Sequence, residues 1–229
     1  MALSHVVTSA YTHTAATSHT FNYNADGADV IMFNGNIEGA NTVASVTFNS
    51  VGFTLLQRIT GDNVSQWYLE NPAQGVQSLV ITYNQEEGPQ AGCGGVGGYA
   101  GVSTTSAIGA KFNSGTAPTA ATSYSTDFTT LSDNSFNVNM LRINGTSQNI
   151  SHTGIGMTER QESNGTESSS SSGEQSTTVA GIYTISYSWG DSLTPRFGVI
   201  ELQEEPTVES THVRGPSGGV AVFSGAAYF

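Results

Sequence analysis

The sequence is poor in charged residues, and most of the charges it carries are negative. Charged residues make up 10% of the 229-residue chain, and 18 Asp and Glu against six Lys and Arg give a net charge of −12. Lys111 is the only lysine, and the arginines are scattered along the chain. A surface that binds nucleic acid or anionic lipid needs clustered Lys and Arg. We therefore expect no nucleic-acid partner and no membrane partner.

Cysteine and long apolar runs are also scarce. Cys93 is the only cysteine, which excludes an internal disulfide. With no base beside it in the sequence, we expect a small buried side chain rather than a nucleophile. The first 20 residues lack the basic start and the apolar core of a secretion signal. No apolar run reaches the ~18 residues that are needed to span a bilayer.

What the chain has instead is Ser, Thr, Asn and Gly, in segments whose apolar residues recur at every second position. No segment of ten or more residues follows the 3.6-residue period of a helix. The sequence therefore predicts an all-β protein. Within that class we expect a single antiparallel β-sandwich of jelly-roll type over residues 1–203, followed by an extended C-terminal arm over 204–229.

Residues 30–33 are apolar at successive positions, so we expect a central strand that is buried on both sides. The segment Asn49-Ser50-Val51-Gly52 is typical of a hairpin turn, with Asn and Gly at the left-handed positions.

Residues 64–84 show the two-residue alternation most clearly. Apolar residues alternate around Trp67 and again up to Tyr83, and the segment Asn71-Pro72-Ala73-Gln74-Gly75 between them is typical of a turn. We predict a hairpin in which Trp67 is an anchor of the core. Tyr68 has the opposite parity, so we expect it to be an aromatic side chain that faces outwards.

Two further segments have an unusual composition. The glycine-rich run "AGCGGVGGYAGV" at 91–102 predicts a strand that packs closely against a neighbour. The serine-rich run "SNGTESSSSSGEQS" at 163–176 predicts an exposed loop. Deletion of Ser168 to Ser172 from such a loop should leave the fold intact, because loop-closure entropy changes slowly with length.

The residues that could carry chemistry form no recognisable set. The five histidines have no zinc-ligand spacing, so we expect them on the surface. Asn24, Asp26 and Asp29 echo the spacing of a calcium loop, but the distal glutamate is missing, and an Asx turn is the simpler interpretation. We can name no nucleophile with a base. We therefore expect no enzyme, no cofactor and no metal.

The linker from Glu201 to Glu209 is acidic, so we expect it to be solvated, and the end of the arm is apolar. Burial of apolar surface stabilises a contact by ~25 cal/mol per Å². We therefore predict that this end carries assembly by docking on a neighbouring chain. A strand added to the arm's own sandwich is the open alternative. The predicted assembly residues are Val220, Val222, Phe223, Tyr228 and Phe229.

Six segments, taken in order, resemble a known family. They are "ASVTFNSVGFTLL" (44–56), "VSQWYLENPAQGVQSLVITYN" (64–84), "GYAGV" (98–102), "GIGMTERQE" (154–162), "IYTISYSW" (182–189) and "RFGVIEL" (196–202). Together they resemble a β-sandwich domain that recurs in tailed-phage virion proteins and in exported bacterial proteins of poorly defined role. The resemblance covers residues 3–203, so the arm lies outside it, and the domain stands here without catalytic or repeat modules.

The resemblance implies a non-enzymatic phage structural protein that is located in the virion. It would be a capsid decoration (cement) protein or a component of a head or tail fibre, with other virion proteins as partners. By analogy it also implies a homo-oligomer, for which we expect a trimer. The alternative is a carbohydrate-binding or adhesin module that binds glycans, and its sign would be two or more exposed aromatic side chains on one concave face.

Overall fold

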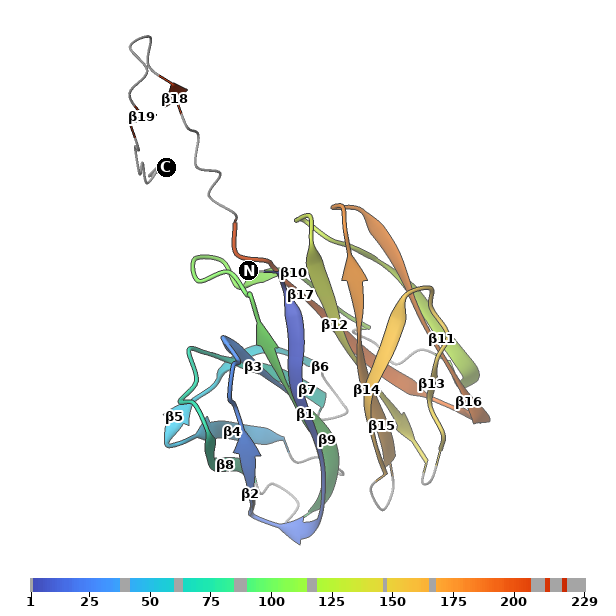
Figure 1. Ribbon diagram of the computed structural model, residues 1–229. Helices are drawn as coiled ribbons and strands as arrows, with labels where there is room; N and C mark the ends of the chain where they lie inside the picture. The colour runs from blue at the N-terminus through green and yellow to red at the C-terminus, as the bar shows by residue number, and fades with distance from the viewer. Residues whose placement is uncertain are drawn as a thin grey trace.

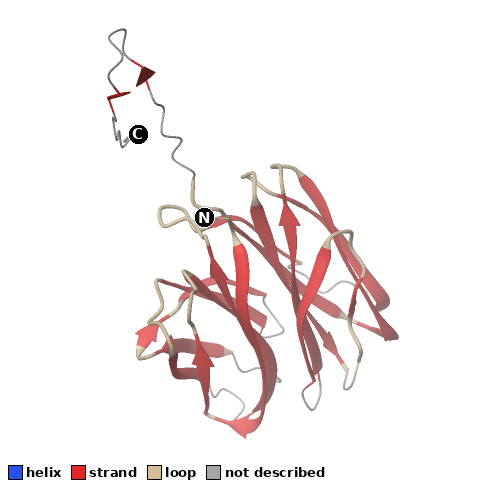
Figure 2. Ribbon diagram, in the orientation of Figure 1, coloured by secondary structure: helices blue, strands red, loops and turns tan. Residues whose placement is uncertain are grey.

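The computed structural model describes residues 2–37, 42–59, 64–84, 90–114, 119–145, 148–164, 168–206, 213–214 and 220–221. Every regular element within these residues is a β-strand (Figure 2), which confirms the predicted all-β class. The first half of the chain contains β1 (Ser4–Ala16), β2 (Ser18–Asn24), β3 (Val30–Ile37), β4 (Val43–Phe48), β5 (Val51–Gly52), β6 (Thr54–Ile59), β7 (Val64–Glu70), β8 (Val76–Tyr83) and β9 (Gln90–Ala100). The second half contains β10 (Ile108–Asn113), β11 (Ala121–Thr129), β12 (Ser135–Asn144), β13 (Ser151–His152), β14 (Met157–Asn164), β15 (Ser168–Thr177), β16 (Ile182–Leu193) and β17 (Pro195–Leu202). Two short strands, β18 (Val213–Arg214) and β19 (Val220–Ala221), follow.

Four antiparallel sheets make up the body of the molecule (Figure 1). In the first half, sheet 1 has the order β1-β9-β3-β7-β6 and sheet 2 the order β2-β8-β4-β5. In the second half, sheet 3 has the order β10-β17-β12-β15-β14 and sheet 4 the order β11-β16-β13. Each half encloses an apolar core between its two sheets. The chain therefore builds two sandwiches, where the sequence predicted one.

The two halves share one strand order. In sheet 1, β1 lies beside β9 and β9 beside β3, just as β10 lies beside β17 and β17 beside β12 in sheet 3. In sheet 2, β2 lies beside β8, just as β11 lies beside β16 in sheet 4. The small strand β5 is the one addition in the first half. An irregularity repeats as well, because the register shifts between Leu55 and Gln57 where β6 meets β7, and between Glu159 and Gln161 where β14 meets β15. The described chain is thus a tandem of two folds with the same topology.

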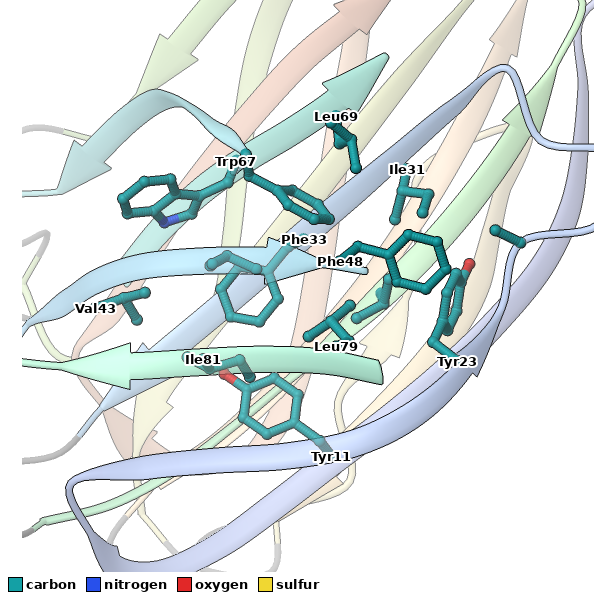
Figure 3. Packing of buried hydrophobic residues seen from close by; sticks show 14 of the residues in the cluster. Tyr11, Tyr23, Ile31, Phe33, Val43, Phe48, Trp67, Leu69, Leu79 and Ile81 are labelled. Atoms are coloured by element: carbon teal, nitrogen blue, oxygen red, sulfur yellow. The ribbon is translucent and has the colours of Figure 1, made fainter. Parts of the chain in front are cut away.

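The apolar cores follow from the two-residue period of the strands. In the first half, Phe33 of β3 and Trp67 of β7 face Leu79 and Ile81 of β8 across the sandwich (Figure 3). Trp67 is 6% exposed, which confirms it as a core anchor. The second half uses matching positions of its own next-to-last strand. The inward trios are Leu79, Ile81 and Tyr83 in β8, and Ile185, Tyr187 and Trp189 in β16.

Sheets 1 and 3 also pack on each other, through the faces that point away from the two cores. Val30, Met32 and Tyr99 of sheet 1 meet Val138 and Ile200 of sheet 3 in a third buried cluster. Strand β3 is consequently buried along its whole length. This confirms the prediction that residues 30–33 form a central strand covered on both sides.

The hairpin predicted across residues 64–84 is a corner between two sheets. β7 belongs to sheet 1 and β8 to sheet 2, and the two strands pair with different neighbours. Asn71 (φ 49°) and Gly75 (φ 83°) take the left-handed conformations of the corner. The Asn71 N–H donates a hydrogen bond to Asp29 O at 2.8 Å. Both strands turn apolar side chains towards one core, and strands on opposite sides of a core cannot pair with each other.

The serine-rich segment is a buried strand, so the prediction of an exposed loop is wrong. β15 pairs with β12 on one side and with β14 on the other. Ser168 to Ser171 are 0% exposed. Their burial depends on β9, whose glycines let β14 and β15 approach closely. The hydroxyls are satisfied locally, since Ser169 Oγ donates to Gly145 O at 2.8 Å and Ser171 Oγ donates to Gln161 O at 3.0 Å.

The folded body extends slightly beyond residue 203. Glu204 forms a β-bridge to Val102, and the Glu205 N–H donates to Gly101 O at 2.9 Å. Glu201, which the sequence placed in a solvated acidic linker, is 0% exposed in β17. Its carboxylate instead accepts hydrogen bonds from backbone N–H groups of β10 and of residues 131–132.

Candidate functional site

A groove lies in the second half, where sheet 4 is incomplete. β13 pairs with β16 at two positions and ends at His152. The chain then turns away through residues 153–156, which leaves the edge of β16 over residues 182–184 without a partner strand in the described residues, beside a groove of about 570 Å³. Gln175 of β15 lines the groove as well, and its Nε2 donates a hydrogen bond to Ile155 O at 2.7 Å.

The groove is uncharged and its rim is apolar. None of the residues that line it is acidic or basic. Ile155 is 94% exposed and Ile182 71% exposed, and both belong to the lining. Val179, also exposed, lies next to it, since Tyr183 of the lining donates its hydroxyl to Val179 O at 2.6 Å. Large apolar side chains gathered in this way mark surfaces that another apolar group can cover.

The first half shows what this part of sheet 4 lacks. There β4 pairs with β8 at five positions, from Val43↔Tyr83 to Phe48↔Leu79. Its counterpart in the second half, β13, pairs with β16 at two positions. The short strand is therefore the reason why the edge of β16 is open.

Backbone groups on the open edge of β16 point into this gap. In an antiparallel ladder, the N–H and C=O of alternate residues point to the same side. Ser186 O accepts the Thr153 N–H at 2.9 Å on the β13 side, so the N–H and C=O of Thr184 point to that side too. In the part of the chain that the structure describes, no strand pairs with Thr184 there. Its hydroxyl donates to Asp127 Oδ1 of β11 at 2.7 Å, across the paired edge.

Polar side chains fill the seam between the two halves, where β9 meets β14 and β15. Cys93 Sγ accepts hydrogen bonds from Asn36 Nδ2 at 3.3 Å and from Ser170 Oγ at 3.4 Å. Ser163 Oγ donates to Tyr11 O at 2.7 Å and so ties the second half to the first. Cys93 is a small buried residue, as predicted. The seam therefore joins the halves through small polar groups.

Charged and titratable groups close one side of this seam. Arg160 and Glu174 form an ion pair within the second half. From the first half, the His5 ring packs edge-on against the Tyr99 ring, with centroids 5.4 Å apart. Burial, and then the nearby Arg160 charge, lower the pKa of His5 to about 4. Burial, and then Glu174, raise the pKa of Tyr99 well above its ordinary value. At neutral pH both side chains are therefore neutral.

The predicted outward aromatic, Tyr68, lies on the face of β7 that parity assigns to it, but this face is covered. Its side chain is half-buried and packs against the third cluster, between sheets 1 and 3. Burial raises the pKa of its hydroxyl. The prediction that Tyr68 faces solvent is corrected, because it assumed a single sandwich whose outer face is wet.

The predicted assembly residues fall at the end of the arm. Val220 lies in β19, which pairs with β18 through Val213↔Ala221 and Arg214↔Val220. The other four predicted residues lie outside the described residues, so their role stays a prediction. They are Val222, Phe223, Tyr228 and Phe229.

Four large aromatic residues of β7, β8 and β16 that could stack on a sugar ring lie in the cores instead. Trp67, Tyr83, Tyr187 and Trp189 are all buried. Tyr183 is the one aromatic residue in the groove lining. The described residues therefore place a single aromatic side chain where a concave binding face would need two or more.

The polar residues that the sequence singled out have structural roles. Asn24 Oδ1 accepts the Asp26 N–H at 3.1 Å, which confirms the Asx turn, and Asp29 Oδ2 accepts the Gly101 N–H at 2.6 Å. The expectation that all histidines lie on the surface is wrong for His152, which is half-buried. Its Nε2 lies 2.7 Å from Ser171 Oγ, and burial lowers its pKa to about 4.

Two kinds of feature are absent from the described residues. No group of three or more His, Cys, Asp or Glu lies close enough in these residues to hold a metal ion. No helix in the same part of the chain is long and apolar enough to cross a membrane.

Sequence reasoning did not identify the groove. Ile182 breaks the alternation of its strand, because it lies on the parity opposite to Tyr183 and Ile185. Ile155 is an isolated apolar residue between two glycines. An apolar residue on the polar parity of a strand is the signal that could have indicated an exposed apolar position here.

Comparison with known proteins gives little further guidance. No family model matches the chain, and no curated protein matches it either. Among solved structures, the chain is similar to a turret protein of Sulfolobus turreted icosahedral virus, with 10% sequence identity over 87% of this chain and 99% of that chain. The TM-score is 0.19, so the two backbones do not superpose as wholes. The likeness carries no argument about function.

Proposed function

We propose that this chain is a non-enzymatic structural protein of a phage particle, which works by self-assembly and by docking on neighbouring subunits. The observation that supports this most is the groove, where part of the edge of β16, an inner strand of sheet 4, has no partner strand in the described residues and lies beside exposed apolar side chains. Open strand edges are normally covered or blunted in proteins that stay monomeric. A partner that covers the edge is the simplest reason to keep it.

Within this role, capsid decoration (cement) and a place in a head or tail fibre are the two positions we propose. A body of two tandem sandwiches suits a projecting module. The six segments that resemble the virion domain fall three in each half, at 44–56, 64–84 and 98–102, and again at 154–162, 182–189 and 196–202. The net charge of −12 favours solubility before assembly.

We also propose that each half is a jelly roll. The order β1-β9-β3-β7 facing β2-β8-β4-β5 supports this description, because it is the order of two Greek keys folded into a pair of facing four-stranded sheets. The second half supports it with the same order. Jelly rolls occur in capsid proteins and in lectins, so this topology is compatible with both functions considered for the chain.

Two measurements test the structural role. Mass spectrometry of purified particles from the phage that encodes the chain should find it in many copies per particle. Light scattering of the purified protein should give a homo-oligomer, for which we expect a trimer. Particles that lack the chain would contradict the proposed function, whatever the protein does alone.

A carbohydrate-binding or adhesin module is the second candidate, and Tyr183 in the groove favours it. A tyrosine can stack on a sugar ring while polar neighbours such as Gln175 and Thr184 bind its hydroxyls. A glycan array separates the candidates. Binding that is lost in Tyr183→Ala would favour the module, and an array without signal would leave the structural role.

A further inference from the structure

The open edge of β16 and the apolar end of the chain are complementary in kind. The edge offers the N–H of Thr184, whose C=O lies close to Gly154, and the groove beside it offers Ile155 and Ile182. An extended peptide that adds to such an edge gains main-chain hydrogen bonds from the strand and buries alternate side chains in the groove. Such a peptide must be extended, uncharged and apolar.

The C-terminal segment of this protein, residues 220–229, has these properties. Its sequence is "VAVFSGAAYF", which contains no charged residue and no proline. At ~3.3 Å per residue its ten residues reach ~33 Å when extended, and the three edge residues 182–184 span about a third of that. The segment is therefore long enough to cover the edge and to continue past it.

The start of the segment lies away from β16 in its own chain. In its own chain, Val220 and Ala221 pair with β18 and not with β16. The first residues of the segment therefore do not occupy the groove of their own chain. A second copy brings a second segment, and a contact of this head-to-tail kind closes into a ring or extends into a filament.

We propose that the C-terminal segment of one subunit adds as a strand to the open edge of β16 in a second subunit and places its apolar side chains against Ile155 and Ile182. This contact supplies the strand that the second half lacks relative to the first. The inference rests on the proposed assembly function and names the contact through which it acts.

The test uses full-length protein and two sets of variants. The groove variant is Ile155→Glu with Ile182→Glu, at positions whose exposure lets the fold tolerate a charge. The segment variant is Val222→Asp with Phe223→Asp. The first half supplies a control, Val51→Glu with Val76→Glu, at positions that are 53% and 62% exposed, and Val76 begins β8 as Ile182 begins β16.

Sedimentation velocity across a concentration series measures self-association. The wild type and the control should associate alike, and the groove and segment variants should each associate at least tenfold more weakly. An equimolar mixture of these two variants should form dimers, because one of them keeps an intact segment and the other an intact groove. Circular dichroism checks that every variant is folded.

Any of the following results would overturn the contact. The groove variant could associate like the wild type, the control could lose association to the same extent, or the mixture could stay monomeric, which would indicate docking within one chain. Wild-type protein that never associates would also overturn it. If the contact fails this test but the chain is found in particles, the proposed function still holds. If particles lack the chain, the proposed function itself is wrong.

Discussion

At the residue scale, close backbone approach explains why the strand at the seam is rich in glycine. A Cβ atom on Gly94 would lie 2.3 Å from Asn34 O and 2.8 Å from the Cα of Gly35. Both atoms belong to the backbone of the neighbouring strand β3, which cannot move aside without breaking its own ladder. The composition of this segment is therefore a packing requirement and not a mark of flexibility.

We expect Gly94→Ala to lower the free energy of unfolding by ~1–3 kcal/mol or more, because overpacking here displaces a backbone. Gly52→Ala is the matched control, since a Cβ on Gly52 meets nothing within 4 Å. Urea unfolding followed by circular dichroism measures both. Equal stability of the two variants would mean that β3 and β9 are not packed as described.

Histidine burial predicts how stability depends on pH. An unfolded histidine takes up a proton at its ordinary pKa near 6.5, whereas burial lowers the pKa of His152 to about 4 in the folded chain. Between these two values the unfolded state binds more protons, so stability is full above pH 6.5 and falls as the pH drops towards 4. His5 has a pKa lowered in the same direction and adds to this loss.

We expect His152→Gln to flatten this dependence, because glutamine keeps a hydrogen-bonding group near Ser171 Oγ and takes up no proton. The free energy of unfolding, measured from pH 7.5 to 4 for both proteins, checks it. Carboxylates titrate equally in the two proteins, so the difference between the curves belongs to His152. Parallel curves would contradict the burial of this side chain.

At the element scale, the serine-rich strand β15 shows how a polar segment becomes part of the interior. Its backbone is fully engaged between β12 and β14, and its small side chains fit against the glycines of β9. Composition alone indicated a loop, since serine runs are typical of mobile linkers. The deciding factor is β9, which packs against β15 although it lies more than 60 residues away in the sequence.

We now expect deletion of Ser168 to Ser172 to abolish folding, in contrast to the expectation from sequence alone. The deletion removes half of β15 and with it two ladders of sheet 3. Replacing the same five serines by alanine should instead give a folded protein of lower stability, because the ladders use backbone atoms and only the hydroxyl hydrogen bonds are lost. Far-ultraviolet circular dichroism and solubility distinguish the outcomes. A folded deletion variant would show that β15 is not an interior strand.

At the scale of the whole molecule, the third cluster couples the two sandwiches. Sheets 1 and 3 bury apolar side chains against each other, and the polar seam adds hydrogen bonds between the halves. Neither half keeps its outer face covered without the other. The protein is therefore expected to unfold as one cooperative unit.

The two tryptophans make this coupling measurable, because Trp67 lies in the first core and Trp189 in the second. Trp67→Ala should cost ~3–5 kcal/mol by the large-to-small rule for cores. It also leaves Trp189 as the single tryptophan reporter, located in the unmutated half. Under coupling, Trp189 fluorescence and circular dichroism shift together to lower urea. A Trp189 transition that stays at the wild-type midpoint would show that the halves unfold separately.

The sequence by itself determined the local properties of this protein. The two-residue period predicted the all-β class, the burial of Trp67 and the double-sided burial of residues 30–33. The turn residues predicted the Asx turn at Asn24 and a hairpin within Asn49-Ser50-Val51-Gly52, and the structure confirms both. The left-handed positions of the hairpin are Asn49 (φ 47°) and Ser50 (φ 66°), whereas Gly52, which was expected at one of them, lies in β5. These features depend on a residue and its near neighbours, and so they can be inferred from the order of residues alone.

Only the tertiary structure decided which strands pair and which faces are covered. Every strand presents the same backbone donors and acceptors, so the period that fixes its apolar side does not name its partner. For this reason the 64–84 segment is a corner and not a hairpin, Tyr68 is covered, and the serine run is interior. The groove has the same origin, since it exists because β13 pairs with β16 at two positions where β4 pairs with β8 at five. A gap in a sheet is a property of two strands together, and neither sequence segment contains it alone.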